Sequence, residues 1–216
     1  MPRRALRKLD PALDLSFHLK SLANVLQPGR DGTLFQRDAP LEVEVGSGKG
    51  LFLQSAATAN PDHNFLGIEI AMKYARFAAA RLAINKLPNA LVIHGDAQRL
   101  FSEFLPNESL AAVHVYFPDP WWKKRHHKRR VMNESFVRQI DRTLTPKGAL
   151  HFWTDVRDRF EATLQLIAAN TSLAGPLEVS ERPAQHNLDY RTHFERRMRL
   201  SGQPVYRAEF RKTWSV

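Results

Sequence analysis

Short apolar runs alternate with segments of helical period along the chain from residue 41 onward. The apolar runs predict strands at 41–45, 64–70, 91–94, 111–117 and 149–153. The segments between and after them predict helices at 49–59, 71–85, 97–104, 133–144 and 155–170. Strands separated by helices are typical of βαβ units. The pattern therefore predicts an α/β fold, with a doubly wound, mostly parallel sheet covered on both faces.

The two ends of the chain follow this pattern less closely. Residues 1–40 show no periodicity beyond a helix at 11–25, so we treat them as an N-terminal extension whose structure the pattern does not define. Residues 146–148 read as a turn, and 171–190 as a loop-rich stretch with one short strand. A helix at 192–201 and a strand at 205–213 predict a hairpin-like closing pair. Residues 41–216 are expected to form a single domain.

Composition narrows the class of protein. With 216 residues the chain can bury a core without a disulfide or metal, and it has no cysteine. Thiolate catalysis, thiolate zinc sites and disulfides are therefore excluded. No apolar run approaches the ~18–20 residues that a membrane span needs. We expect an intracellular, cytoplasmic protein without a membrane segment.

The charge of the chain is strongly basic and unevenly distributed. It has 32 Lys and Arg against 22 Asp and Glu, a net charge of +10 and a pI near 10.2. The basic residues gather at 3–8, at 123–130, and at 191–199 with Arg207, Arg211 and Lys212 beyond. This balance predicts a nucleic acid or an anionic surface as partner. Charge alone supports binding and does not distinguish an enzyme from a basic assembly protein.

One segment combines an acid with a dense basic run. Asp119 stands between Pro118 and Pro120, and each proline restricts the backbone around it. Six of the eight residues at 123–130 are Lys or Arg, a density suited to a polyanion. A fixed carboxylate beside a phosphate-attracting run suggests chemistry on a nucleic acid. The simpler interpretation is a turn followed by a solvated charge run.

Four carboxylates follow one another at the ends of predicted strands. Glu44, Glu69, Asp96 and Asp119 are 25, 27 and 23 residues apart, about one βα unit each. Ligands of open parallel sheets bind beyond the carboxyl ends of the strands, so we expect these side chains to converge on one pocket. The alternative is that two or three of them only cap helices.

The turn after the first of these strands indicates a nucleoside ligand. Its sequence, Glu44-Val-Gly46-Ser-Gly48-Lys-Gly50, lets the backbone approach a ligand, although a glycine loop alone is a weak signal. Glu69 fits a carboxylate that accepts from both ribose hydroxyls, and Asp96 could accept from an adenine amino group. An acid before the loop disfavours a pyrophosphate and suits a cationic ligand such as the amino-acid part of S-adenosylmethionine.

These motifs together resemble the bacterial tRNA (guanine-N7)-methyltransferase family. The resemblance covers residues 41 to 216 and rests on residues 44–50, Gly67-Ile-Glu-Ile70, Gly95-Asp-Ala97, Phe117-Pro-Asp-Pro-Trp121 with the basic run, Thr154-Asp155, and Thr192-His-Phe-Glu195. It implies a seven-stranded class I methyltransferase fold, S-adenosylmethionine as cofactor, and tRNA as partner. The implied product is N7-methylguanine at position 46 of the variable loop.

The resemblance also implies roles for individual residues. Glu44, Gly46, Gly48, Glu69, Asp96 and Asp119 are implied for cofactor binding, with Asp119 also catalytic. Lys123, Asp155, Thr192, His193, Phe194 and Glu195 are implied for the substrate, and Arg125, His126, His127, Lys128, Arg129 and Arg130 for RNA. His126 and His127 lack a third metal ligand at sensible spacing, so no metal site is expected. Trp121 either stacks on the base or fills core, and Trp122 departs from the family pattern.

Two other functions remain open from the sequence. One is a non-catalytic RNA-binding or assembly protein on a Rossmann-like fold, against which the glycine loop and its four acids argue. The other is a methyltransferase acting on another RNA or on an exocyclic amine, although Asp119-Pro-Trp121 departs from the usual Pro-Pro element of those enzymes. The sequence leaves open whether the protein is a monomer or a homodimer, and whether Asp119 or Asp155 contributes more to the chemistry.

Overall fold

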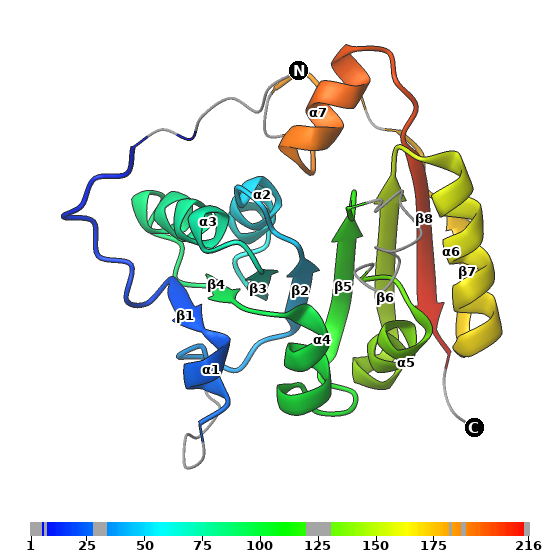
Figure 1. Ribbon diagram of the computed structural model, residues 1–216, viewed down its shortest axis with the longest axis horizontal. Coiled ribbons are helices and arrows are strands. Elements are labelled where there is room, and N and C mark those ends of the chain that lie inside the picture. The colour runs from blue at the N-terminus through cyan, green and yellow to red at the C-terminus, as the bar shows by residue number, and fades with distance from the viewer. Residues whose placement is uncertain are drawn as a thin grey trace.

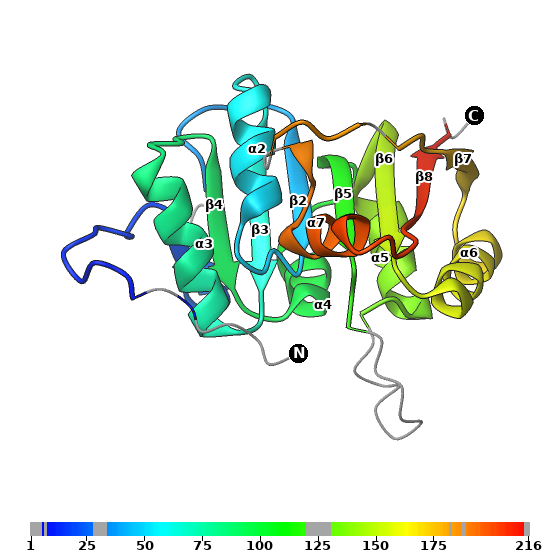
Figure 2. The same ribbon diagram turned by 90° about the horizontal axis from the view of Figure 1, so that it is seen from above.

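Eight strands form one sheet in the order β1-β4-β3-β2-β5-β6-β8-β7 (Figures 1 and 2). The computed structural model describes residues 6, 8–27, 34–119, 131–181, 183–186 and 189–213. The strands are β1 (Leu19–Ser21), β2 (Leu41–Val45), β3 (Asn64–Glu69), β4 (Ala90–His94), β5 (Leu110–Tyr116), β6 (Leu144–Thr154), β7 (Leu173–Glu178) and β8 (Tyr206–Lys212). The pairs from β1 to β6 are parallel, and β8 runs antiparallel to both β6 and β7.

The helices cover both faces of this sheet, which confirms the predicted doubly wound α/β fold. They are α1 (Leu22–Val25), α2 (Leu51–Ala59), α3 (Met72–Ile84), α4 (Ala97–Arg99), the π-helical turn η1 (Leu100–Phe104), α5 (Glu134–Thr143), α6 (Arg157–Asn170) and α7 (His193–Leu200). On one face α2 and α3 pack through Phe52, Ala78 and Leu82. On the other face η1 and α5 pack through Phe101, Phe136 and Ile140.

Alternation along β2 shows how the sequence assigns these faces. Val43 and Val45 belong to the core under η1 and α5, while Glu42 and Glu44 point to the opposite face. Asn133 begins α5 as predicted, because its side chain accepts a hydrogen bond from the backbone N–H of Phe136 at 3.0 Å. The order of the sheet reverses between β3-β2 and β2-β5, and this reversal is where open α/β sheets bind ligands.

Two sequence predictions about elements are wrong. Residues 11–25 do not form one helix: β1 pairs with β4, Leu19 opposite Val92, and only the short α1 follows. This edge strand makes the sheet eight-stranded, where seven strands were expected. The turn expected at 146–148 instead lies inside β6, which begins at Leu144 directly after α5. The register shift against β5 and the positive φ of Lys147 (67°) absorb the extra residues.

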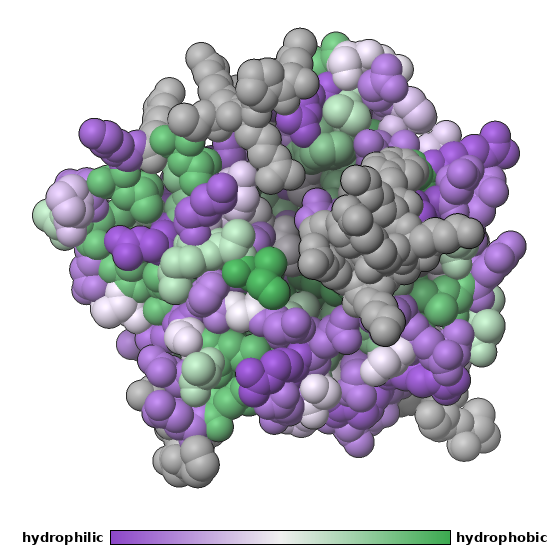
Figure 3. Space-filling view, in the orientation of Figure 1, coloured by the Kyte–Doolittle hydropathy of each residue, from purple (hydrophilic) through white to green (hydrophobic). Residues whose placement is uncertain are grey.

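Helix α7 lies beyond the carboxyl ends of the central strands, toward which the arrowheads of β2 and β5 point (Figure 1). Seen from above, it crosses over that edge of the sheet (Figure 2). On the face shown in Figure 3, the described hydrophobic residues form small patches separated by hydrophilic ones. The arrangement places α2, α3, β5 and α7 around the carboxyl ends of the parallel strands.

Candidate active site

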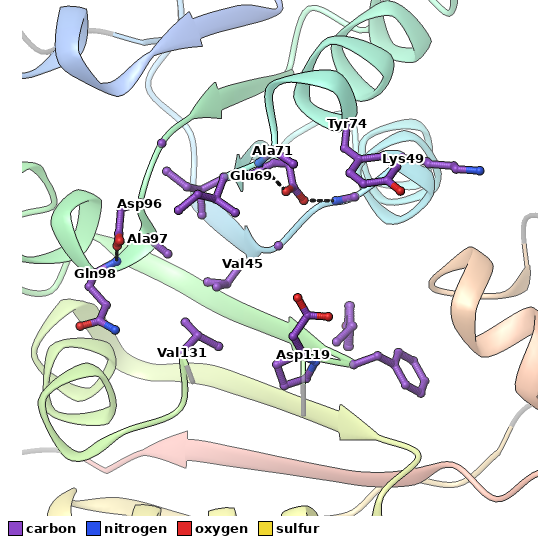
Figure 4. Close-up of a pocket in the computed structure, with 18 residues that line it drawn as sticks. Val45, Lys49, Glu69, Ala71, Tyr74, Asp96, Ala97, Gln98, Asp119 and Val131 are labelled. Carbon is purple, nitrogen blue, oxygen red and sulfur yellow. Dashed lines mark hydrogen bonds between the residues drawn. The ribbon is translucent and has the colours of Figure 1, made fainter. Parts of the chain in front are cut away.

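A cavity of about 700 Å³ opens at the carboxyl ends of β2, β3, β4 and β5. Glu69, Asp96 and Asp119 enter it from three different strand ends, as the sequence predicted. In Figure 4 the Asp119 carboxylate points into the same space as Glu69, and Asp96 lies at another end of that space. The remaining lining residues are Val45, Gly46, Gly48, Lys49, Ile68, Ile70, Ala71, Tyr74, Gly95, Ala97, Gln98, Tyr116, Phe117, Pro118 and Val131.

The glycine loop between β2 and α2 is bound to the end of β3. Gly46 and Gly48 take left-handed φ angles of 77° and 53°, which residues with a side chain rarely adopt. The Glu69 carboxylate accepts hydrogen bonds from Gly48 N and from Ala71 N, each at 2.9 Å. Each carboxylate oxygen keeps a further acceptor position for a ligand hydroxyl. Glu69 therefore holds the loop in place and can still bind a ligand.

Glu44 is a buried carboxylate at the mouth of this loop. It is 2% exposed, and its Oε2 has no hydrogen-bond partner among the described residues. Burial, and then the charge of Glu69, raises the pKa of Glu44 well above its ordinary value. A buried acceptor without a protein partner is costly unless a ligand donates to it. The site therefore suits a ligand with a cationic or N–H donor group.

Asp96 combines the two roles that the sequence left open. Its Oδ1 caps α4 by accepting from Gln98 N at 2.7 Å and from Arg99 N at 3.4 Å. Its Oδ2 accepts no hydrogen bond from the described residues, and the side chain is exposed at the cavity wall. The capping interpretation is thus correct for Asp96 without removing it from the cavity.

The chain reverses at the end of β5 in a strained conformation. Phe117 N donates to the Trp153 carbonyl at 2.8 Å, and Phe117 then takes a φ of 50°, which is rare for a bulky residue. Such outliers gather at functional sites. Asp119, two residues later, is exposed at the mouth of the cavity.

A second cavity of about 310 Å³ lies between the glycine loop and α7. Gly46, Gly48, Lys49, Tyr74, Tyr116 and Phe117 line both cavities. Glu44 lines only this one, together with Ser47, Leu51, Phe52, Thr192, His193, Phe194 and Arg197. The four strand-end carboxylates are therefore distributed over two adjoining cavities, not gathered in one.

The Thr192–Glu195 motif divides into two anchoring and two cavity-facing residues. Thr192 Oγ1 accepts from Glu195 N at 3.0 Å and so caps α7, and Glu195 accepts from the N–H of Arg191, the residue before the cap, at 2.6 Å. Glu195 is buried and forms ion pairs with Arg199 at 3.3 Å and Arg207 at 3.5 Å. These bonds present His193 and Phe194 to the second cavity, where the Phe194 ring centroid lies 4.9 Å from that of Phe117.

Arg81 of α3 joins the glycine loop to α7. Its Nε donates to the Lys49 carbonyl at 2.9 Å, and its Nη1 donates to Gln54 Oε1 at 2.6 Å. Its Nη2 lies 3.2 Å from His193 Nε2. Burial, followed by the charges of Arg81, Lys49 and Arg196, lowers the pKa of His193 to about 4. A neutral His193 can accept the Arg81 hydrogen bond near pH 7.

Tyr116 is held at the base of both cavities by a buried chain of hydrogen bonds. Its hydroxyl lies 2.9 Å from His114 Nδ1, and His114 Nε2 lies 2.6 Å from Glu42 Oε2. If Glu42 accepts from Nε2–H, Nδ1 accepts from the tyrosine hydroxyl. Burial raises the pKa of Tyr116, so this residue stays protonated and fixed.

The structure does not place every predicted substrate and RNA residue in the two cavities. Lys123, Arg125, His126, His127, Lys128, Arg129 and Arg130, with Trp121 and Trp122, lie outside the described residues. Asp155 follows the end of β6, half-buried, and is not among the lining residues of the two cavities. The structure thus brings Glu44, Glu69, Asp96, Asp119 and the Thr192–Glu195 motif to one edge of the sheet.

Sequence reasoning did not select Tyr74, Lys49 or Arg81. Tyr74 and Lys49 line both cavities, and Arg81 connects the loop to α7. Tyr74 and Arg81 lie in α3, whose sequence pattern indicates an apolar face and carries no signal for either residue. Lys49 stands inside the glycine motif, so its position was the one available signal. Among the described residues there is no group of three metal-ligating side chains, and no described helix is long and apolar enough to cross a membrane.

Comparison with known proteins shows to which family the chain is similar. The family model described as “Putative methyltransferase” matches residues 38–208. A tRNA (guanine-N(7)-)-methyltransferase of Rhodopirellula baltica is 52% identical over 98% of this chain and 80% of its own length. One of Nitrosococcus oceani is 37% identical over 83% of this chain and 75% of its own length.

The solved structures support the same fold. The aminoglycoside resistance methyltransferase NpmB1 aligns with a TM-score of 0.56 and 19% identity, covering 89% of this chain and 92% of its own. At this identity the likeness concerns the fold alone. It agrees with the class I methyltransferase arrangement that the resemblance in the sequence implied, apart from the added edge strand β1.

Proposed function

The chain belongs to the family of the tRNA (guanine-N(7)-)-methyltransferases, and we propose that it transfers a methyl group from S-adenosylmethionine to N7 of a guanine in tRNA. The identity of 52% over nearly the whole chain carries this proposal. The cavities at the switch point of the sheet support it, because they offer acceptors suited to a nucleoside and to a cationic group. A tRNA substrate and the basic pI agree with a cytoplasmic enzyme.

The residues present fit S-adenosylmethionine. Glu69 and Asp96 line the first cavity, where they could accept from the ribose hydroxyls and the adenine amino group, and the glycine loop could allow a close backbone approach. Glu44 is buried, its Oε2 has no hydrogen-bond partner among the described residues, and it is our candidate acceptor for the amino-acid part. When bound, the cofactor supplies an electrophilic methyl group on a sulfonium.

Asp119 is the residue that we assign to orientation of the guanine. N7 carries an in-plane lone pair, so the reaction needs no general base at this atom. Alignment and exclusion of water then supply most of the catalysis. The Asp119 carboxylate can accept from guanine N1–H and the 2-amino group, and it can stabilise positive charge that develops on the ring. Adenine lacks these donors, which gives a basis for selectivity.

The second cavity is our candidate for the base itself. Phe117 and Phe194 offer aromatic surface there, and Thr192 and Glu195 hold the segment that carries Phe194 and His193. Asp155 follows the neighbouring strand end and remains a second candidate for substrate contact. Asp119 lines the first cavity, and Phe117, two residues before it, lines both cavities.

The basic run at 123–130 is proposed to bind tRNA phosphates. It follows Asp119 directly, so a phosphate contact there would bring the RNA to the mouth of the cavity. Guanine 46 of the variable loop is the proposed target. This finer assignment rests on the resemblance of the motifs to the family.

Incubation with methyl-labelled cofactor and total tRNA, followed by nucleoside analysis, tests the function. We expect label in N7-methylguanosine alone. Mapping the label on one tRNA, with a variant in which guanine 46 is replaced, tests the position. Label in another nucleoside, or transfer only to ribosomal RNA, would refute the proposed substrate.

A further inference from the structure

The exposed surface of α3 is basic where helix chemistry favours acid. The helix carries Lys73, Arg76 and Arg81 and no acidic residue. Its first turn contains Lys73, whereas the first turns of α5, α6 and α7 contain Glu134, Asp158 and Glu195. The amino end of a helix is partially positive, so a cation there opposes helix stability. A residue that opposes the stability of its own helix in this way is expected to serve a function.

The pairing of these cations also differs from that of other helices. Arg138, Arg157 and Arg99 each form an i,i+4 ion pair with a glutamate, at 3.0, 2.8 and 2.7 Å. Lys73 and Arg76 are exposed and form no ion pair with any described residue. Their charges are therefore available to an external anion.

The position of the two residues connects them to the cavities. Lys73 Nζ lies 5.1 Å from the ring centroid of Tyr74, which lines both cavities. Arg76 follows at i+3, on the same exposed side of the helix. Across the second cavity, Arg197 of α7 lies with its guanidinium 4.7 Å from the Phe194 ring centroid.

We propose that Lys73 and Arg76, with Lys49 and Arg197 across the second cavity, form a tRNA-phosphate-binding surface, the α3–α7 rim, separate in sequence from the run at 123–130. This inference rests on the proposed function, because it takes the partner to be tRNA. The rim would hold the RNA backbone on the α3 side of the cavities while the basic run holds it beside Asp119.

Electrostatics gives a reason for such a rim. Glu44, Glu69, Asp96 and Asp119 line the two cavities and repel a polyanion at their mouth. Screening limits this repulsion, and its compensation, to about 8–10 Å at physiological salt. Cations that offset it must therefore lie close to the cavities, as Lys73 does through its contact with Tyr74. A surface for an apolar partner fits less well, since among the described residues only Ile70 and Met72 are exposed large hydrophobic residues beside Lys73.

The test is the salt dependence of tRNA binding, measured without methyl transfer. The variant is Lys73→Gln/Arg76→Gln. The control is Lys86→Gln/Arg138→Gln, which removes one Lys just beyond the carboxyl end of α3 and one Arg from α5, both outside the lining of the two cavities. We expect the log–log slope of the rim variant to fall by about 1.4–1.8, that is 0.7–0.9 for each lost contact. The control slope should stay at the wild-type value.

Two further measurements complete the test. Cofactor affinity should not change in the rim variant. Its melting temperature should stay equal or rise slightly, because a cation leaves the positive end of α3. A slope equal to that of the control would overturn the rim. Failure of wild-type protein to methylate tRNA would refute the proposed function. Even then, weaker tRNA binding by the rim variant than by the control would support the α3–α7 rim as an RNA-binding surface.

Discussion

Arg81 and His193 join α3 to α7 through a contact of 3.2 Å between Nη2 and Nε2. The same guanidinium binds the Lys49 carbonyl at 2.9 Å, so one side chain touches both the glycine loop and the motif that begins α7. The loop is the proposed cofactor site and the motif is part of the proposed substrate site. Arg81 can therefore communicate the state of one to the other through direct contacts.

Arg81→Met should uncouple these two sites. The methionine keeps an apolar stem but donates no hydrogen bond to Lys49 O, Gln54 or His193. We expect the KM for tRNA to rise about tenfold and any cooperativity between cofactor and tRNA binding to disappear, a loss of about 1.4 kcal/mol. Titration calorimetry with each ligand, alone and with the other present, measures this coupling. His193→Ala should reproduce the tRNA effect with less loss of stability, and unchanged cooperativity in both variants would contradict the role.

The Arg81–His193 contact should also depend on pH. Because the pKa of His193 is lowered to about 4, the contact is fully present above the ordinary pKa of 6.5 and is lost as the pH falls through about 4. Cooperativity between the ligands should thus persist at pH 6 and weaken near pH 4. NMR titration of the His193 ring checks the midpoint, and a value near 6.5 would show that the ring is not held as described.

Glu44→Gln should stabilise the ligand-free protein and weaken cofactor binding. Since its pKa is raised, protonated Glu44 contributes stability below its ordinary pKa of 4.5, and this is lost as the pH rises through the raised pKa. At pH 8 the variant should be more stable than wild type by about 1–3 kcal/mol, with little difference at pH 4.5. Thermal unfolding across this pH range gives the measurement, and calorimetry should show reduced cofactor affinity.

Glu42→Gln, on the same strand as Glu44→Gln, is a control for which we expect the opposite change in stability. Burial alone would raise the pKa of Glu42, but hydrogen bonds from His114 and His63 outweigh it and lower the pKa. Removing this carboxylate should therefore destabilise the protein at pH 7. Equal changes in stability for the two variants would show that the environments of the two glutamates do not differ as described.

Asp119→Asn should reduce turnover while leaving the fold intact. The amide keeps the shape of the side chain but replaces one acceptor by a donor, which would face the guanine N–H groups. We expect at least a ~100-fold fall in kcat, about 2.7 kcal/mol, with a melting temperature within a few degrees of wild type. Single-turnover kinetics with saturating cofactor measures this. Nearly normal methylation would shift the assignment to Asp155, and loss of folding would show that Asp119 serves the turn.

Neutralising Lys128, Arg129 and Arg130 together should lower the salt dependence of tRNA binding. Each lost phosphate contact reduces the log–log slope by roughly 0.7–0.9. Cofactor affinity should hardly change. Combination with Lys73→Gln/Arg76→Gln should give additive slope changes if the two surfaces contact different phosphates. A collapse of cofactor binding with an unchanged slope would mean that the run is structural.

The fold could be predicted from sequence where hydrophobic periodicity is strong. The alternation along 41–45 marked β2, because its valines and its glutamates face opposite sides of the sheet. The apolar run at 91–94 marked β4, because a strand buried on both faces reads as a continuous apolar run. The pattern failed at β1, a three-residue edge strand with no fully buried residue. At 144–148 the register shift within β6 resembles a turn in sequence, since both need residues such as Pro and Gly.

The candidate site was predictable from spacing in its strand-end acids, and from the family resemblance in the Thr192–Glu195 motif. Their spacing follows the length of one βα unit, so Glu69, Asp96 and Asp119 could be placed together without a structure. Whether Glu44 opens to the same cavity depends on side-chain packing, and it lines the neighbouring one. The contacts of Arg81 join residues 112 positions apart, and no local pattern in the sequence indicates such a pair.

The antiparallel insertion of β8 between β6 and β7 has a consequence for synthesis on the ribosome. Residues 206–212 are made after every other described strand, yet they form an interior strand bonded on both sides. Until they leave the exit tunnel, the edge of β6 stays open and β7 has no partner in the sheet. The β1–β5 half can pair earlier, because its strands are all complete by residue 116. A nascent chain should therefore acquire the half of the sheet that carries the proposed cofactor site before its second half closes.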